Sequence, residues 1–164
     1  MMRAPVLPQS RERLWGVVAS RLDVIESGLE LVLEGLDCSG GQHGLLDGLA
    51  RDCTGAPVLI ALAVAGDVLL VPRIVLATEF LERVGDGLAT AVPEGSFCIG
   101  AKPRVLVITT KVVGSNIPML LRLGLPALEI CQLEPFRIAG SERFAVRWIE
   151  SVQAINASAA CAPF

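Results

Sequence analysis

Histidine is almost missing from this sequence of 164 residues, because only His43 is present. One histidine cannot build a cluster of cysteine and histidine metal ligands, and it leaves a single candidate for histidine-based acid–base catalysis. His43 stands beside Gly44 in a glycine-rich turn, where a lone histidine is more often simply solvated. Both a catalytic base and an ordinary turn residue are therefore open at this position.

Closely spaced cysteines are also missing. The chain has five cysteines, an odd number, and none of them forms a CxxC pair. Their wide spacing fits neither a zinc site nor a disulfide framework. We therefore predict free thiols in a reducing compartment, several of them buried as small apolar side chains, and no bound cofactor. The five residues are Cys38, Cys53, Cys98, Cys131 and Cys161.

An excess of positive charge is missing as well, since the net charge is −3. A DNA-binding domain usually carries a basic face, so nucleic acid is a disfavoured partner. The best candidate for a phosphate track is Arg137, Arg143 and Arg147, close together near the end of the chain. Glutamates are interleaved with them, which favours an ordinary salt-bridged surface.

No apolar run is long enough to cross a membrane. The most apolar stretch, from Ala56 to Val71, carries Asp67, whereas a spanning helix needs about 20 predominantly apolar residues. The first residues, MMRAPVLPQSRERLW, have neither the apolar core nor the cleavage pattern of a signal peptide. Phosphate-loop, GxGxxG and GxSxG motifs are also missing. We predict a cytoplasmic protein without a membrane segment.

What the chain does have is apolar side chains, at 52% of all residues against 19% charged. A chain of 164 residues is long enough for one domain that buries roughly 70% of its unfolded surface. Such a composition leaves apolar area for a partner, so we predict a homodimer or a complex with another protein. Terminal hairpins often lie at exposed sheet edges, which makes Phe136, Phe144 and Trp148 the predicted contact residues.

Apolar periodicity and turn signals divide the chain into helices and strands. Residues 1–10 are predicted to be a flexible arm, 11–150 the folded domain and 151–164 a C-terminal tail. Whether Val68 to Val71 belongs to a strand or to the following helix is left open. The predicted elements are a helix from Ser10 that carries its apolar face to Val32, strands at 44–51 and 58–64, a helix at 72–91, a strand at 104–109, a helix at 116–123, a strand at 126–133, and a hairpin of 136–138 with 144–148.

This order of elements favours a single α/β domain with a mixed central sheet and helices on both faces. The segment from Val58 to Val64 is apolar at every position. A strand that is covered by helices on both sides has this composition, so we place it at the centre of the sheet.

Two stretches of the sequence resemble the PD-(D/E)xK nuclease superfamily, in particular its NucS-like mismatch endonucleases. Residues 44–52 read GLLDGLARD and are followed by a glycine turn, which is similar to the first strand of the family motif. Residues 104–108 (RVLVI) and 133–137 (LEPFR) are similar to its later strands. The resemblance implies a restriction-endonuclease-like fold.

In this family an aspartate and a glutamate hold a divalent cation, and a lysine orients or activates the attacking water. The resemblance places the aspartate at Asp47, but it places Ala61 and Ala63 where the glutamate and lysine belong. A helix glutamate of the family is matched by Glu26 or Glu30. Asp47 itself is either a former metal ligand or a carboxylate that is hydrogen-bonded near a strand end.

The resemblance therefore implies a catalytically inactive nuclease-like domain that acts as an interaction module. Two alternatives stay open. One is a pseudonuclease that still binds nucleic acid. The other is a residual metal-dependent nuclease in which Asp67, Lys102 or Lys111 supplies a lost group.

Overall fold

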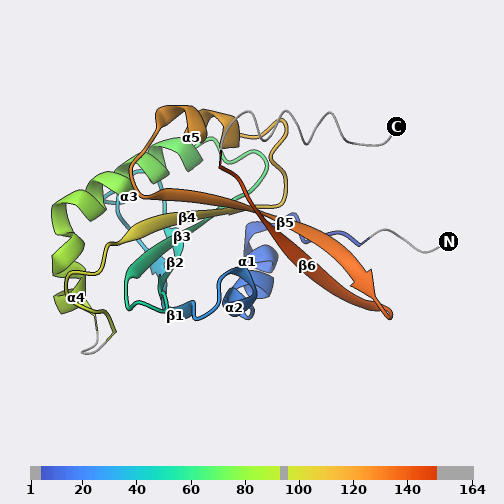
Figure 1. Cartoon of the computed structure of the whole chain (residues 1–164). Coiled ribbons are helices and arrows are strands. Elements are labelled where there is room, and N and C mark those ends of the chain that lie inside the picture. Colours follow the sequence, from blue (N-terminus) through green and yellow to red (C-terminus); the bar gives the residue numbers. More distant parts are fainter. Residues whose placement is uncertain (1–4, 93–95, 151–164) are drawn as a thin grey trace.

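The computed structural model describes residues 5–92 and 96–150, which form twelve helical and strand elements in a single α/β domain (Figure 1). The elements are α1 (Arg11–Ala19), α2 (Leu22–Ile25), β1 (Glu30–Leu36), β2 (Leu46–Arg51), β3 (Pro57–Ala63), α3 (Leu70–Val84), η1 (Gly85–Gly87), α4 (Leu88–Ala91), β4 (Arg104–Thr109), α5 (Ile117–Leu123), β5 (Leu128–Ile138) and β6 (Ser141–Trp148).

The six strands form one sheet in the order β1-β2-β3-β4-β5-β6, which is also their order along the chain. The pairs β1–β2, β2–β3 and β5–β6 are antiparallel. The pairs β3–β4 and β4–β5 are parallel, with α3 and α5 in the connections between them. The sheet is therefore mixed, as the sequence predicts.

Helices cover both faces of this sheet (Figure 1). Buried residues of α1 and α2 pack with one set of strand side chains, and those of α3, α4 and α5 pack with the other set. All seven residues of β3 are buried, which confirms the predicted central strand. Within the described residues no helix combines the length and the apolar character that a membrane crossing requires.

The prediction of one long helix from Ser10 to Val32 is wrong. The helix α1 ends at Ala19, α2 is a single turn, and the strand β1 begins at Glu30. Gly28 has φ of +84°, a left-handed conformation that interrupts a helix. The apolar residues in this region belong to two short helices that pack on the sheet and then to an edge strand. Periodicity alone therefore predicts a helix where the strand β1 lies.

The other predicted elements lie close to their observed positions. The open question about Val68 to Val71 is resolved, because α3 begins at Leu70. Gly124 follows α5 with φ of +58°, as predicted for a residue that ends a helix. The predicted helix 72–91 is interrupted by η1, and the predicted strand 126–133 runs on as β5 to Ile138.

The last two strands leave the body of the sheet as a twisted ribbon (Figure 1). β4 pairs with β5 only as far as Gln132, while β6 follows β5 to its end at Ile138. Beyond Gln132 the strand β5 therefore has a partner on one side only. A proline is tolerated at such a position, and Pro135 stands there.

Of the predicted arm, the structure describes residues 5–10. Residues 5–10 contain no helix or strand, yet Leu7 is buried in the core on the side of α1 and α2. The predicted tail, 151–164, lies outside the described residues.

Candidate functional site

The loops that follow β3 and β4 enclose a cavity of about 280 Å³ at the carboxyl ends of these parallel strands. Ligands of open α/β sheets commonly bind outside the carboxyl ends of strands. Asp67, Lys111, Ser115 and Asn116 are among the residues that line the cavity. Asn116 donates a hydrogen bond to the backbone oxygen of Asp67 and so ties the two loops together.

Asp47 lies beside this cavity, on β2, and both oxygens of its carboxylate accept hydrogen bonds. The Nε and Nη2 atoms of Arg11 donate to its two oxygens at 2.8 and 2.7 Å. The backbone N–H of Leu62, on β3, donates to the same carboxylate at 2.7 Å. The side chain is only 8% exposed. This paired arrangement of guanidinium and carboxylate is among the stronger hydrogen-bonded contacts in proteins.

Asp67, in the turn between β3 and α3, is held in a similar way. Its Oδ2 lies 2.8 Å from Nη1 of Arg73 and 3.5 Å from Nη1 of Arg11. Its Oδ1 accepts a hydrogen bond from the backbone N–H of Leu69. Arg11 therefore lies between two aspartates, and the chain Asp47–Arg11–Asp67–Arg73 forms a connected set that we call the carboxyl-end network.

The carboxyl-end network contains two positive and two negative side chains, so it is electrically balanced. The hydrogen bond to Asp47 is the main reason that the pKa of Arg11 is raised; burial opposes it, and the charges of Asp47 and Asp67 add to it. Arg11 therefore stays a cation. Arg73 also donates from Nε to the backbone oxygen of His43 at 2.7 Å, which fixes the loop before β2.

No local pattern in the sequence indicates Arg11 as a partner of Asp47, because 36 residues separate them. The sequence pattern does indicate a partner for Arg73. It lies among the buried positions of α3, with Leu70, Ile74 and Ala77. A charged residue on the apolar side of an amphipathic helix indicates a buried ion pair, since an unpaired charge there is costly.

Ala61 and Ala63 are buried on β3 at 0% and 6% exposure. Both belong to the core on the side of α3, where Ile74 and Ala77 also lie. Ala63 additionally lines the cavity. The two positions that the resemblance assigns to the family's glutamate and lysine therefore contribute methyl groups to the core.

Glu26 lies at the other end of the sheet from Asp47. It accepts a hydrogen bond from Nη2 of Arg104 at 2.6 Å, and Arg104 pairs with Val58 at the start of β3. Asp47 instead reaches Leu62, four residues further along the same strand, about 13 Å away at 3.3 Å per residue. The resemblance matches a helix glutamate to Glu26 or Glu30, and Glu26 is the residue that follows α2, at the end of the strands away from Asp47.

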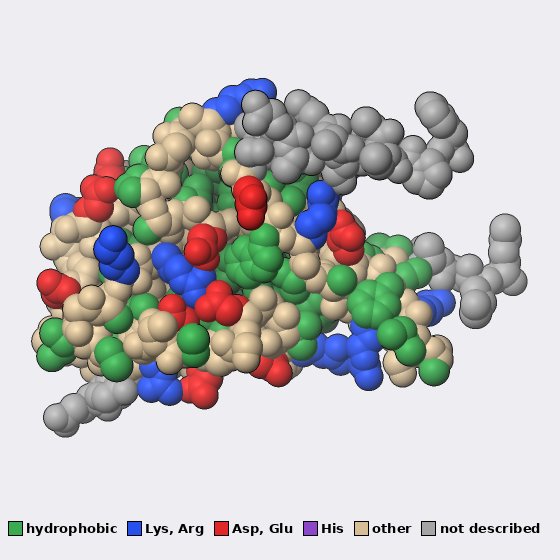
Figure 2. All heavy atoms as spheres, viewed as in Figure 1, with side chains coloured by type: hydrophobic (Ala, Val, Ile, Leu, Met, Phe, Trp, Pro, Cys, Tyr) green, Lys and Arg blue, Asp and Glu red, His purple; other side chains and the backbone are tan. Residues whose placement is uncertain are grey.

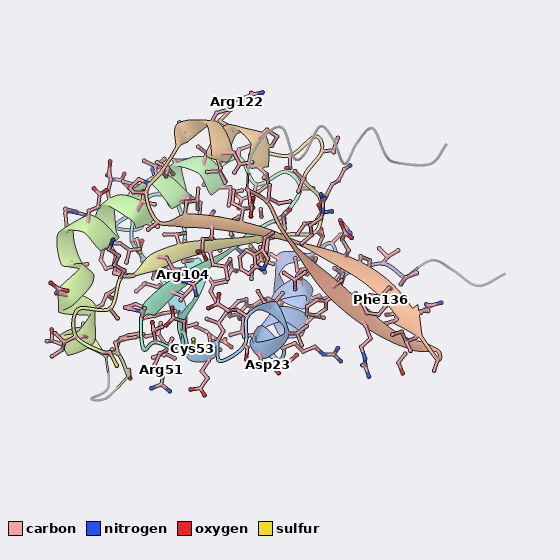
Figure 3. The ribbon with its side chains drawn as sticks, viewed as in Figure 1. Asp23, Arg51, Cys53, Arg104, Arg122 and Phe136 are labelled. Atoms are coloured by element: carbon pink, nitrogen blue, oxygen red, sulfur yellow. The ribbon has the colours of Figure 1, made fainter. Side chains whose placement is uncertain are left out.

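Glu30, the alternative to Glu26, belongs to β1 and pairs with Arg51 at 2.6 Å. Arg104 and Arg51 both lie at this second end of the sheet, together with Cys53 (Figure 3). Asp52 lies 3.4 Å from Arg104, and Glu129 of β5 also pairs with Arg104. Three carboxylates at this end, those of Glu26, Asp52 and Glu129, are thus gathered around Arg104.

A divalent cation of the kind that the resemblance implies does not fit the described residues. Within 5–92 and 96–150, no three His, Cys, Asp or Glu side chains come together around one point. The oxygens of Asp47 and Asp67 already accept hydrogen bonds from arginines and backbone N–H groups. Lys111 lines the cavity but Lys102 does not, so at most one of the two candidate lysines is near Asp67.

His43 is half-buried, and its Nδ1 is a buried atom without a hydrogen-bond partner in the described part of the chain. It does not line the cavity at the carboxyl ends. The hydrogen bonds of this residue are made by its backbone: its N–H donates to the hydroxyl of Ser39 at 3.0 Å, and its oxygen accepts from Arg73 at 2.7 Å.

The predicted contact residues on the last hairpin do not share one surface. Phe144 is only 6% exposed and packs in the core on the side of α1, so its use as an exposed contact is contradicted. Trp148 is 41% exposed. Phe136 lies opposite Arg143 in the ribbon, on the face away from Phe144, because Pro135 is the residue that pairs with Phe144.

The three arginines of the hairpin do not form a phosphate track. Arg137 pairs with Glu142 at 2.7 Å, and Arg147 pairs with Glu134 at 2.9 Å. Arg143 projects to the face opposite Arg137, since adjacent pairs in the register alternate between faces. Figure 2 shows basic and acidic side chains interspersed over the visible face. A salt-bridged surface is therefore observed, as predicted.

No protein-family model matches this chain and no curated protein matches its sequence. Among solved structures, an EndoMS–dsDNA2 complex aligns with a TM-score of 0.47 and 20% identity over 84% of this chain. A repair endonuclease from Pyrococcus abyssi aligns with a TM-score of 0.44 and 18% identity over 80%. This chain spans 50% of each of those chains.

Proposed function

We propose that this domain is a catalytically inactive, nuclease-like module that works by binding a protein partner or a second copy of itself. The observation that carries the proposal is the engagement of Asp47, whose carboxylate oxygens accept hydrogen bonds from Arg11 and Leu62. A carboxylate that is already paired with a guanidinium is a poor ligand for a metal ion.

The chemistry of the strand β3 supports the same proposal. Metal-dependent hydrolysis needs groups that hold the cation and stabilise developing negative charge. Ala61 and Ala63 provide neither, and both are packed against the side of α3. The ion pairs of Arg137 and Arg147 with neighbouring glutamates give no support to the alternative of nucleic-acid binding.

The ribbon of β5 and β6 is the surface that best suits a partner. Two strands alone are marginally stable in water, and the described residues supply no third strand to the outer part of the ribbon. Ile138 at its tip is 63% exposed, and Trp148 at its base is 41% exposed. A partner that pairs with the free edge of β6 or covers these side chains would complete the sheet.

A cleavage assay tests the loss of catalysis. The purified chain is incubated with single- and double-stranded DNA in the presence of Mg²⁺ or Mn²⁺, beside an Asp47→Ala variant. We expect both proteins to leave the DNA intact. Cleavage by the parent that disappears in Asp47→Ala would contradict the proposal, whereas equal cleavage by both would indicate a contaminating nuclease.

Light scattering at tens of micromolar tests self-association. We expect the parent to be a dimer, the commonest closed assembly, and Ile138→Asp to shift it toward the monomer. Met119→Asp is the matched control, because Met119 is 53% exposed but lies on α5. A monomeric parent would show that self-association is wrong.

A further inference from the structure

Arg11 holds its two aspartates from a distant part of the chain. It is the first residue of α1, and its guanidinium reaches Asp47 on β2 and Asp67 after β3. Its Nη2 also donates to the backbone oxygen of Leu45 at 3.1 Å. One side chain thus brings a positive charge to a point between two carboxylates that are 8% and 10% exposed.

Removing Arg11 would leave this place short of positive charge. Arg73 already pairs with Asp67 at 2.8 Å, and within the described residues its guanidinium donates to Asp67 and to the backbone oxygen of His43 rather than to Asp47. Two aspartates would then face one arginine. A poorly exposed carboxylate without a counter-charge is costly, so it binds a cation where one can enter.

Water and ions can reach this place from two sides. The cavity of about 280 Å³ includes Asp67 and, from the N-terminal segment, Gln9. A shallow groove on the other side is lined by Arg11, Asp47 and Glu34 among others. Gln9 thus lines the cavity, Arg11 lines the groove, and Arg11 contacts both aspartates.

We infer that Arg11 is a built-in replacement for a divalent cation, and that its removal turns Asp47 and Asp67 into a site for a hard divalent ion. Mg²⁺, Mn²⁺ and Ca²⁺ take oxygen ligands, and one or two carboxylates with water molecules are enough for a weak site. The inference rests on the proposed function only in that both require Asp47 to be engaged by Arg11 in the parent.

Thermal melting with added salt tests the inference. The variant Arg11→Met removes the charge and keeps an unbranched side chain, and Arg13→Met is the matched control on the exposed side of the same helix. Each protein is melted in millimolar MnCl₂ or CaCl₂ and in NaCl of equal ionic strength. We expect Arg11→Met to gain a few degrees of Tm with the divalent ions over NaCl. The parent and Arg13→Met should gain nothing.

The double variant Arg11→Met, Asp67→Asn locates the ion, because it should lose most of the gain. If Arg11→Met does not fold alone, circular dichroism gives the same information, since a required ion restores the helical signal and NaCl does not.

Two results would overturn the inference. One is a folded Arg11→Met chain that gains no stability from either ion, and the other is a parent that gains as much as the variant. DNA cleavage by the parent would count against the proposed function instead, so the two failures are distinguishable.

Discussion

Nη2 of Arg104 lies 2.6 Å from Oε1 of Glu26, across 78 residues of sequence. The contact joins the end of α2 to the first residue of β4, and the same guanidinium also pairs with Asp52 and Glu129. Its side chain is only 14% exposed. One arginine therefore pairs with carboxylates from three separate parts of the fold.

Replacing Arg104 by methionine should lower the free energy of unfolding by about 2 kcal/mol, because partly buried carboxylates lose their counter-charge. Urea denaturation at pH 7 measures the loss. Arg122→Met is the control, since Arg122 is exposed on α5 at the far side of the molecule (Figure 3). The control should stay within about 0.5 kcal/mol of the parent. Equal losses in the two variants would show that the cluster around Arg104 adds nothing specific.

Restoring the family's catalytic pair should damage the fold. The double variant Ala61→Glu, Ala63→Lys places two ionisable groups at positions that are 0% and 6% exposed. Even a paired buried charge is expensive to desolvate, so we expect a large fall in Tm or no cooperative melting. Ala145→Glu, at an exposed position of β6, should melt close to the parent. A double variant that melts like the parent would mean that these positions open to solvent.

Asp52 should contribute to stability in a pH-dependent way. Burial alone would raise its pKa, but hydrogen bonds from the Thr54 hydroxyl and from the backbone N–H groups of Ala56 and Thr54, with the charge of Arg104, lower it. A lowered pKa in the folded state means that the contribution is complete above the unfolded pKa of about 3.9. The contribution is lost as the pH falls through the lower folded value.

Asp52→Asn should therefore cost about 1 kcal/mol at neutral pH, and the difference from the parent should shrink at strongly acidic pH. Urea denaturation across this range provides the measurement. Asp23→Asn serves as the control, because Asp23 is exposed on α2. A difference that stays constant with pH would show that the charge of Asp52 is not involved.

The described thiols should differ in reactivity. Burial raises the pKa of Cys38 to about 11 and that of Cys131 to about 12, with nearby acidic side chains adding to both. Cys53 and Cys98 are exposed. Because the thiolate is the reactive form, a thiol reagent should label these two first. Peptide mapping by mass spectrometry distinguishes the sites, and labelling of Cys131 before unfolding would contradict the structure.

Much of the fold could be predicted because its signals are local. The uniformly apolar β3 and the glycine after α5 each reflect one element in one environment. The strand β1 could not be predicted in this way. It lies at the edge of the sheet, with exposed residues among its apolar ones, so its pattern is close to that of a helix.

The site could be predicted only in part, for a related reason. Asp47 is visible as a match to the family motif, and the two alanines are visible as departures from it. The partner of Asp47 is not, because Arg11 reaches it through the docking of α1 on the sheet, and tertiary docking leaves no mark in the local sequence. The motif leaves Glu26 and Glu30 as alternatives, because it gives the order of its residues but not where a short helix packs on the sheet.

Strand order and chain order coincide in this sheet from β1 to β6. Each new strand can pair with the strand made just before it, so no strand has to be inserted between two others. The chain that joins two paired strands is then never longer than one crossover connection, so the entropic cost of closing each loop stays small. During synthesis the sheet can grow from one edge in the order in which the chain emerges, and the ribbon of β5 and β6, which offers the free edge, is completed last.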